Sequence, residues 1–272
     1  MTKSSAVTIA TVITVYNRRH CIARAIDSAL IALPTQRVIV VDDASQDGSA
    51  EHVRGLYANA SYNGQIKLIE LRQNIGVTGA KNCGYEESNE DWVIFLDSDD
   101  AYLPDIGPAI EETLATSGAS PIVFFRCQDQ VGRFVGQRQG EDLQLDLSTY
   151  LKYTSFGEAL TAVNKKLIGA APPYLSDLRG YEGLGCCRLI RKFGPARLSA
   201  ITARVYDTSG ADRLSISAGL LRRLPLIARG HWILVREFGT LISSRNYLTL
   251  LIKASVYFLI GSLYRLACFR KW

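Results

Sequence analysis

The chain has 272 residues, of which 47% are hydrophobic and 21% are charged. These fractions are typical of a globular protein and exclude a disordered, collagenous or coiled-coil chain. The six cysteines include no Cys-x-x-Cys pair, so neither a disulfide framework nor a zinc site is predicted. No basic run followed by a long apolar stretch opens the sequence, so we do not expect a signal peptide.

Charge is distributed unevenly along the chain. Residues 1–150 carry 12 Lys and Arg against 20 Asp and Glu, whereas residues 151–272 carry 19 against 6. A polycationic C-terminal part favours an anionic partner, which can be a phospholipid surface, a phosphorylated substrate or a nucleic acid.

Strands and helices are predicted to alternate over the first 126 residues. Val7–Val15 is a β-branched run typical of a strand buried on both faces of a parallel sheet. The other predicted strands are Arg37–Val41, residues 66–71, Trp92–Leu96, Ile122–Phe125, Arg133–Val135 and Leu198–Tyr206. The first helices are expected after Asn17 as a cap, from Asp47 or Ser49, and over Ala80–Glu87. Repeated βα units of this length predict an α/β fold with a doubly wound, mostly parallel sheet.

Polar motifs follow three of the predicted strands. Ligands of doubly wound sheets bind at the carboxyl ends of the strands, so these motifs are expected to form the functional site. They are Thr14-Val15-Tyr16-Asn17, Val41-Asp42-Asp43-Ala44-Ser45 and Asp97-Ser98-Asp99-Asp100.

The third motif crowds three carboxylates into four residues. Their mutual repulsion costs stability unless a cation lies among them. Mg²⁺ and Mn²⁺ take oxygen ligands and usually bind substrate phosphates as well, so a metal-bridged diphosphate is predicted. The alternative for such a motif is a solvated turn or a helix cap. Its position after a strand, beside two similar motifs, favours the metal site.

These motifs, together with Asn74-Ile75-Gly76 and Ala80-Lys81-Asn82, resemble those of the family-2 glycosyltransferases. The resemblance covers residues 7 to about 105. It implies a GT-A (Rossmann-like) fold and inverting transfer from a nucleotide-diphosphate sugar, which we expect to be a UDP-sugar. It also implies a Mn²⁺ or Mg²⁺ cofactor.

The resemblance also implies roles for individual residues of this half. Thr14 and Tyr16 line the nucleoside pocket, and Asp42 accepts a hydrogen bond from N3 of uracil. Lys81 and Asn82 open a helix after a glycine-containing loop, which suits phosphate or ribose. Asp97 contacts the ribose or the donor sugar, Asp99 coordinates the metal, and Asp100 faces the donor sugar.

An inverting transferase needs a general base for the acceptor hydroxyl. The family usually places this carboxylate in a Gly-Glu-Asp segment that opens a helix, some 80 residues beyond the metal motif. Arg179-Gly180-Tyr181-Glu182-Gly183 occupies that place here, so Glu182 is the predicted base. The chain departs from the pattern by Gly183 in place of Asp and by the inserted Tyr181. The alternative for Glu182 is a carboxylate favoured only by the helix dipole.

The C-terminal segment is apolar and basic. Tyr247–Tyr264 contains one charged residue, Lys253, and lies between basic residues on both sides. This composition suits helices lying in the interface of an anionic membrane, and a buried core helix is the alternative. We therefore expect a catalytic domain at residues 1–214, with a donor half at 1–105 and an acceptor half at 106–214. Residues 215–272 are expected to attach the enzyme to the cytoplasmic face of the inner membrane.

The expected acceptor is a saccharide linked to polyprenyl diphosphate, as used in capsule, exopolysaccharide or O-antigen synthesis. One alternative is a nucleotidyltransferase, but the glycine-rich loop usual after its first strand is missing. A second alternative is a nucleic-acid-binding protein, which would leave the carboxylate motifs unexplained, so no nucleic-acid partner is expected. His20, His52 and His231 are isolated in the sequence and are predicted to be surface or packing residues.

Overall fold

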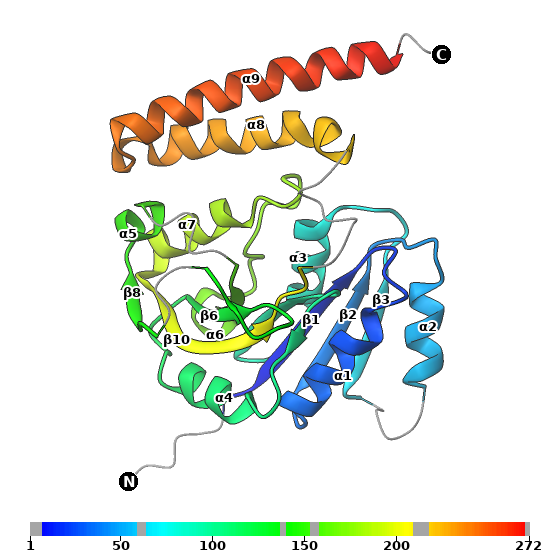
Figure 1. Ribbon diagram of the computed structural model, residues 1–272. Helices are drawn as coiled ribbons and strands as arrows, with labels where there is room; N and C mark the ends of the chain where they lie inside the picture. Colours follow the sequence, from blue (N-terminus) through cyan, green and yellow to red (C-terminus); the bar gives the residue numbers. More distant parts are fainter. Residues whose placement is uncertain (1–6, 59–63, 137–139, 153–157, 209–217, 270–272) are drawn as a thin grey trace.

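The computed structural model describes residues 7–58, 64–136, 140–152, 158–208 and 218–269. Strands and helices alternate from β1 to β4, and the chain ends in two long helices (Figure 1). The strands are β1 Ile9–Val15, β2 Arg37–Asp42, β3 Ile66–Glu70, β4 Trp92–Asp97, β5 Ala101–Tyr102, β6 Ile122–Gln128, β7 Phe134–Val135, β8 Leu143–Leu145, β9 Leu160–Asn164 and β10 Ala196–Val205. The helices are α1 Ile22–Ala32, α2 Ser49–Leu56, α3 Val77–Glu87, α4 Gly107–Ala115, α5 Leu147–Lys152, α6 Lys165–Ile168, α7 Glu182–Phe193, α8 Ala218–Phe238 and α9 Ser244–Phe269.

The strands form one sheet in the order β3-β2-β1-β4-β9-β6-β10-β5. The first four strands of this order are parallel to one another. Strand β9 runs antiparallel between β4 and β6, and β10 is parallel to β6. The predicted α/β fold is confirmed, and the antiparallel β9 separates the four parallel strands β3, β2, β1 and β4 from β6 and β10.

Helices cover both faces of this sheet, which explains why its strands are continuously apolar. On one face, α1 and α4 bury Ile22, Ile26 and Ile110 in a core with alternate residues of β1 and β4. On the other face, α3 and α7 bury Tyr85 and Ile190. The carboxyl ends of the parallel strands therefore lie between two layers of helices.

The turn after β1 differs from the prediction. Asn17 does not cap α1, because the helix begins at Ile22 with Cys21 as its N-cap. Asn17 adopts a left-handed φ of 53°, and its Oδ1 accepts a hydrogen bond from the Gln46 amide at 2.8 Å. The prediction of a cap was wrong because this side chain ties the loops after β1 and β2 together. Helix α3 also begins earlier than expected, at Val77.

The two C-terminal helices form an antiparallel hairpin over α7 (Figure 1). The inner helix, α8, buries Leu234 and Phe238 in a third core with Leu184 and Cys187 of α7. The outer helix, α9, packs along α8. In the part of the chain that the structure describes, Ser244–Tyr264 is the one helix with the length and apolar composition to cross a membrane, and 11% of its most apolar window is buried.

Candidate active site

Three predicted site residues lie at one edge of the sheet because of the strand register. Thr14 of β1 pairs with Asp97 of β4, and Val15 pairs with Asp42 of β2. Parallel strands end at the same edge, so Thr14, Asp42 and Asp97 form one row. Tyr16 follows directly and is 47% exposed, so its ring is accessible.

Asp42 has one carboxylate oxygen in use and one without a partner. Its Oδ1 accepts a hydrogen bond from the Ser45 amide at 2.7 Å. Its Oδ2 is buried, and among the described residues it has no hydrogen-bond partner. A buried acceptor without a donor costs about 1–3 kcal/mol, so this atom suits a ligand N–H.

Asp43 fixes the loop that starts α3. Its two carboxylate oxygens accept hydrogen bonds from the amides of Ile75 and Gly76 at 2.7 and 2.8 Å. Burial raises the pKa of Asp43, although these two bonds oppose the shift. Gly76 has φ 85° and ψ 163°, and the Cγ of Arg179 would lie 2.5 Å from a Cβ placed on it. The sequence motif contained Asp43 and Gly76, but their positioning role appears only in the structure.

Lys81 joins the motif Asp97-Ser98-Asp99-Asp100 to Glu182, the predicted base. This buried side chain extends from α3, and its Nζ lies 3.1 Å from Asp97 Oδ1 and 3.3 Å from Glu182 Oε1. Burial alone would lower the pKa of Lys81, but the two carboxylates raise it above its ordinary value. Asp97 and Glu182, which lie far apart in the sequence, are thereby held around one ammonium group.

Arg204 is a second buried cation that sequence analysis did not assign to the site. It lies on β10, 2% exposed, with its Nη1 3.0 Å from Asp100 Oδ2 and 3.5 Å from Asp97 Oδ2. Its Nη2 lies 3.5 Å from Glu158. The available signal was an arginine near the end of the predicted strand Leu198–Tyr206. Arg213, the next arginine along the chain, lies outside the described residues.

The last two carboxylates of the motif point to different environments. The side chain of Asp99 is 35% exposed, and Arg18 approaches its Oδ2 at 3.8 Å. Asp100 is buried, and its Oδ1 accepts a hydrogen bond from the Asp207 amide at 2.9 Å. Burial, opposed by Arg204, raises the pKa of Asp100 to about 7. Asp100 thus holds Arg204 and the Asp207 segment, a placement that does not support the expected contact with a donor sugar.

Asn82 lies one residue beyond Lys81 but faces another element. Its amide nitrogen donates to the Tyr174 carbonyl at 2.8 Å and to Ser176 Oγ at 2.9 Å, and its oxygen accepts from the Tyr174 amide at 3.1 Å. Both amide hydrogens are therefore in use. This geometry supports a role in positioning the segment before α7 and gives no support to a donor contact.

Glu182 is the first residue of α7, and α8 holds the loop in front of it. The Tyr181 hydroxyl lies 2.6 Å from Nδ1 of His231, and the Tyr181 ring packs on Gly230, where a Cβ would lie 2.8 Å from the ring. Arg223 donates to the Arg179 carbonyl at 3.1 Å. The inserted Tyr181 therefore contacts α8, and His231 is its hydrogen-bond partner there.

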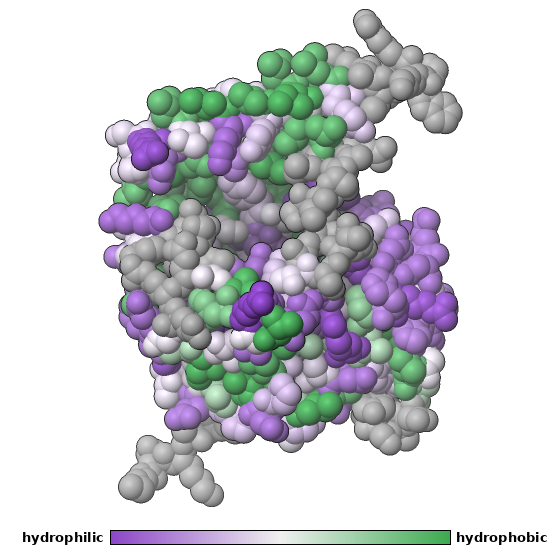
Figure 2. Space-filling view, in the orientation of Figure 1, coloured by the Kyte–Doolittle hydropathy of each residue, from purple (hydrophilic) through white to green (hydrophobic). Residues whose placement is uncertain are grey.

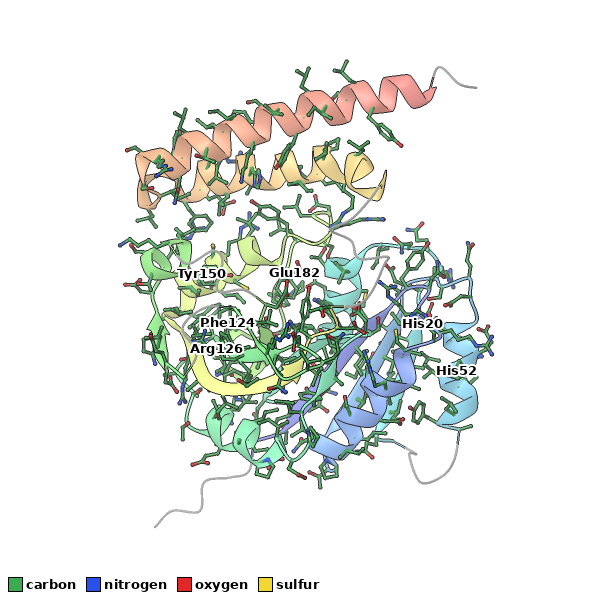
Figure 3. The ribbon with its side chains drawn as sticks, viewed as in Figure 1. His20, His52, Phe124, Arg126, Tyr150 and Glu182 are labelled. Atoms are coloured by element: carbon green, nitrogen blue, oxygen red, sulfur yellow. The ribbon has the colours of Figure 1, made fainter. Side chains whose placement is uncertain are left out.

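Some of these groups line a cavity of about 430 Å³. Its charged lining residues are Lys81, Asp97, Glu158, Glu182 and Arg204, and its aromatic ones are Phe95, Phe124, Tyr150 and Tyr174. Figure 3 shows Glu182 above Phe124 and near Tyr150, whereas His20 and His52 lie away from it beside α1 and α2. A larger hollow of about 690 Å³ lies at the turn between α8 and α9, far from the strand ends. The converging charges assign the candidate site to the smaller cavity.

Known proteins with similar sequences match more than a third of the chain. The succinoglycan biosynthesis protein ExoO of Rhizobium meliloti is 38% identical over 95 residues, which cover 35% of this chain and 26% of that protein. ExoU, another succinoglycan biosynthesis protein of the same organism, is 31% identical over 104 residues, which cover 38% of this chain and 30% of that protein. The chain thus matches less than a third of the length of these relatives.

Solved structures match more of the chain at low identity. The S. aureus TarS fragment 1–349, in complex with UDP-GlcNAc, has a TM-score of 0.65 and 15% identity over 84% of this chain and 66% of that one. The mannosyltransferase PcManGT from Pyrobaculum calidifontis, in complex with GDP-Man and Mn²⁺, has a TM-score of 0.65 and 14% identity over 95% and 74%. The GT-A fold is thereby confirmed.

The model of the family described as Glycosyl transferase family 2 matches residues 11–163, more than half of the chain. The chain therefore belongs to glycosyltransferase family 2.

Proposed function

We propose that the chain transfers a sugar, with inversion, from a UDP-sugar to a saccharide linked to polyprenyl diphosphate. The observation that carries the proposal is the placement of Lys81 between Asp97 and Glu182 in one cavity. A carboxylate at a strand end suits the donor, and a carboxylate across the cavity suits the acceptor. The ammonium group fixes the separation between them.

The nucleoside is assigned to the exposed side of this row. Thr14 and Tyr16 form its wall, and the unpartnered Oδ2 of Asp42 is the acceptor for N3–H of uracil. Base stacking on the exposed Tyr16 ring adds apolar contact. The two structural neighbours were solved with UDP-GlcNAc and GDP-Man, so both carry nucleotide sugars of the proposed class.

The metal is assigned to Asp99, with Mn²⁺ or Mg²⁺ as the ion. Among the described residues no group of three His, Cys, Asp or Glu side chains forms a complete metal site. An exposed carboxylate that needs the oxygens of a diphosphate to complete the coordination shell fits these ions. When bound, the ion supplies positive charge for the departing diphosphate. Asp97, which begins the same motif, is held by Lys81 and Arg204.

Glu182 is the proposed general base. Its carboxylate accepts the proton of the acceptor hydroxyl while that oxygen bonds to the anomeric carbon of the sugar. The bond from the anomeric carbon to the β-phosphate oxygen breaks on the opposite side, and UDP leaves with the electron pair. Attack opposite the leaving group inverts the anomeric configuration.

The class of acceptor is inferred from the relatives and from the hairpin. ExoO and ExoU are named for the biosynthesis of succinoglycan, a polysaccharide. A lipid-linked intermediate in a cytoplasmic leaflet would lie beside an enzyme attached to the same surface. We therefore place the chain at the cytoplasmic face of the inner membrane, in the synthesis of a surface polysaccharide.

Purified full-length protein should be incubated with a panel of UDP-sugars and either Mn²⁺ or Mg²⁺, and released UDP should be measured. Slow donor hydrolysis that stops in EDTA is the expected result, because water replaces the missing acceptor. Release of pyrophosphate from UTP and a sugar 1-phosphate, with no release of UDP from the UDP-sugars, would instead support a nucleotidyltransferase. Full activity in EDTA would contradict the role of the metal.

A further inference from the structure

We infer that α9 lies flat on an anionic phospholipid surface, with one row of its side chains in the lipid and its other face on α8. This inference deepens the proposed function by assigning its membrane surface. It can fail separately, because vesicle binding requires no turnover.

The row consists of large aliphatic side chains on the outer face of α9. Leu248, Ile252, Leu259 and Leu263 are 58%, 54%, 60% and 57% exposed. Their spacings of 4, 7 and 4 residues place them on one side of a helix with 3.6 residues per turn. Figure 2 shows hydrophobic surface running along the position of α9 at the edge of the molecule. Isolated exposed leucines are ordinary, but a continuous row on one helix is a contact surface.

The opposite side of α9 is occupied by protein. Ala254 is fully buried, and the backbone at Gly261 approaches Pro225 of α8 so closely that a Cβ would lie 2.5 Å from its ring. Helix α8 in turn is fixed to α7 through the core that contains Phe238. A helix that crossed the bilayer would carry its partner, with Arg223, Arg229 and Arg236, into the hydrocarbon, at several kcal/mol for each charge. The packing thus favours a helix in the plane of the interface.

Charge selects lipid over a second copy of the chain. Residues 215–272 contain nine Lys and Arg and one acid, Glu237. That acid is already paired, because its Oε1 lies 2.5 Å from Nη2 of Arg188 on α7. A dimer through this face would bring two strongly positive hairpins together, whereas an anionic leaflet provides opposite charge. Arg245 and Lys253 are exposed on α9 itself.

Flotation of full-length protein with vesicles tests the inference. Wild type should float with phosphatidylcholine vesicles that contain phosphatidylglycerol and should float less with phosphatidylcholine alone. The double variant Ile252→Glu/Leu259→Glu should bind about 100-fold more weakly, roughly tenfold for each apolar side chain withdrawn from lipid. Ile31→Glu is the matched control, because Ile31 is 71% exposed on α1 and should bind as wild type does.

Two further measurements separate the other arrangements. In sealed vesicles with added protein, a C-terminal tag should remain open to protease from outside if α9 lies flat. A protected tag would mean that the helix crosses the bilayer and would overturn the inference. Light scattering without lipid should give a monomer. A dimer that the double variant dissociates, with unchanged flotation, would assign the row to self-association.

Discussion

The expected donor half, residues 1–105, and the expected acceptor half, residues 106–214, position their polar groups in different ways. In the donor half, Thr14, Asp42 and Asp97 are the ends of adjacent parallel strands, so backbone register alone brings them together. In the acceptor half, Glu182 begins a helix whose preceding loop is held by side chains of α8, about 50 residues later in the chain. The first arrangement is local to the sheet, and the second depends on a distant element.

Lys81 is the contact between these two halves that involves the proposed base. It extends from the helix whose start is fixed by Asp43, and it pairs with Glu182 across the cavity. The donor half therefore contributes to the position of the proposed base. The hairpin of α8 and α9 contacts Tyr181, the residue directly before Glu182, through His231 of α8. Substitutions in each half should consequently separate donor binding from turnover.

The largest effect is expected for Asp99→Ala. Loss of the proposed metal ligand should abolish UDP release and metal-dependent UDP binding, while removal of one carboxylate from a crowded motif leaves the fold intact. Calorimetric titration with UDP, with and without Mn²⁺, measures this. Asp142→Ala is a control, because Asp142 is also an exposed carboxylate paired with an arginine, Arg197. Unchanged Mn²⁺-dependent binding by the Asp99 variant would remove this residue from the metal site.

Glu182→Gln should reduce turnover by about 10² to 10⁴ while UDP binding is kept, the usual contribution of a positioned base. The amide preserves the shape of the side chain but cannot accept the acceptor proton. UDP release under saturating donor is the measurement. Asp177→Asn is the matched comparison, because Asp177 lies five residues earlier and pairs with Arg229 outside the cavity. If Asp177→Asn loses turnover and Glu182→Gln does not, the acceptor loop has been assigned incorrectly.

Gly76→Ala tests whether the backbone conformation of the loop between Asp43 and α3 requires a glycine at position 76. A backbone at φ 85° and ψ 163° is accessible almost only to glycine, and a Cβ would also displace Arg179. The expected loss of stability is about 1–3 kcal/mol, measured by denaturant unfolding. Gly55→Ala in α2 has open space around the new Cβ and should stabilise the chain by about 0.5–1 kcal/mol. Equal changes in stability for the two variants would contradict the requirement for glycine at position 76.

The same contrast explains what sequence could predict. Short-range signals were enough to predict the first strands and the row Thr14, Asp42 and Asp97. These signals are the β-branched runs and the polar motifs at the strand ends. The prediction that Asn17 caps α1 was wrong because its side chain accepts a hydrogen bond from the amide of Gln46, 29 residues away, instead of from an amide of that helix. Arg204 was left unassigned because its partners lie on other strands.

The chain was expected to divide at residue 214 into a catalytic domain and a membrane segment, and this stays a prediction. Leu234 and Phe238 of α8 share a core with Leu184 of α7, so the hairpin also contributes to the fold. No local pattern in the sequence pairs His231 with Tyr181. Contacts of this kind arise only from tertiary packing, which is why the acceptor half was harder to predict.

The smallest effect is expected for His231→Phe, which removes the partner of the Tyr181 hydroxyl and keeps an aromatic ring. Turnover should fall about tenfold with unchanged UDP binding, because a buried hydroxyl left without a partner costs about 1–3 kcal/mol and loosens the loop before Glu182. His52→Phe on α2 is the control. Adding Tyr181→Phe removes the unpaired hydroxyl and should restore stability, since replacing both partners by apolar groups is nearly neutral. If the bond positions Glu182, turnover of the double variant stays low; if turnover recovers with stability, α8 supports only the fold.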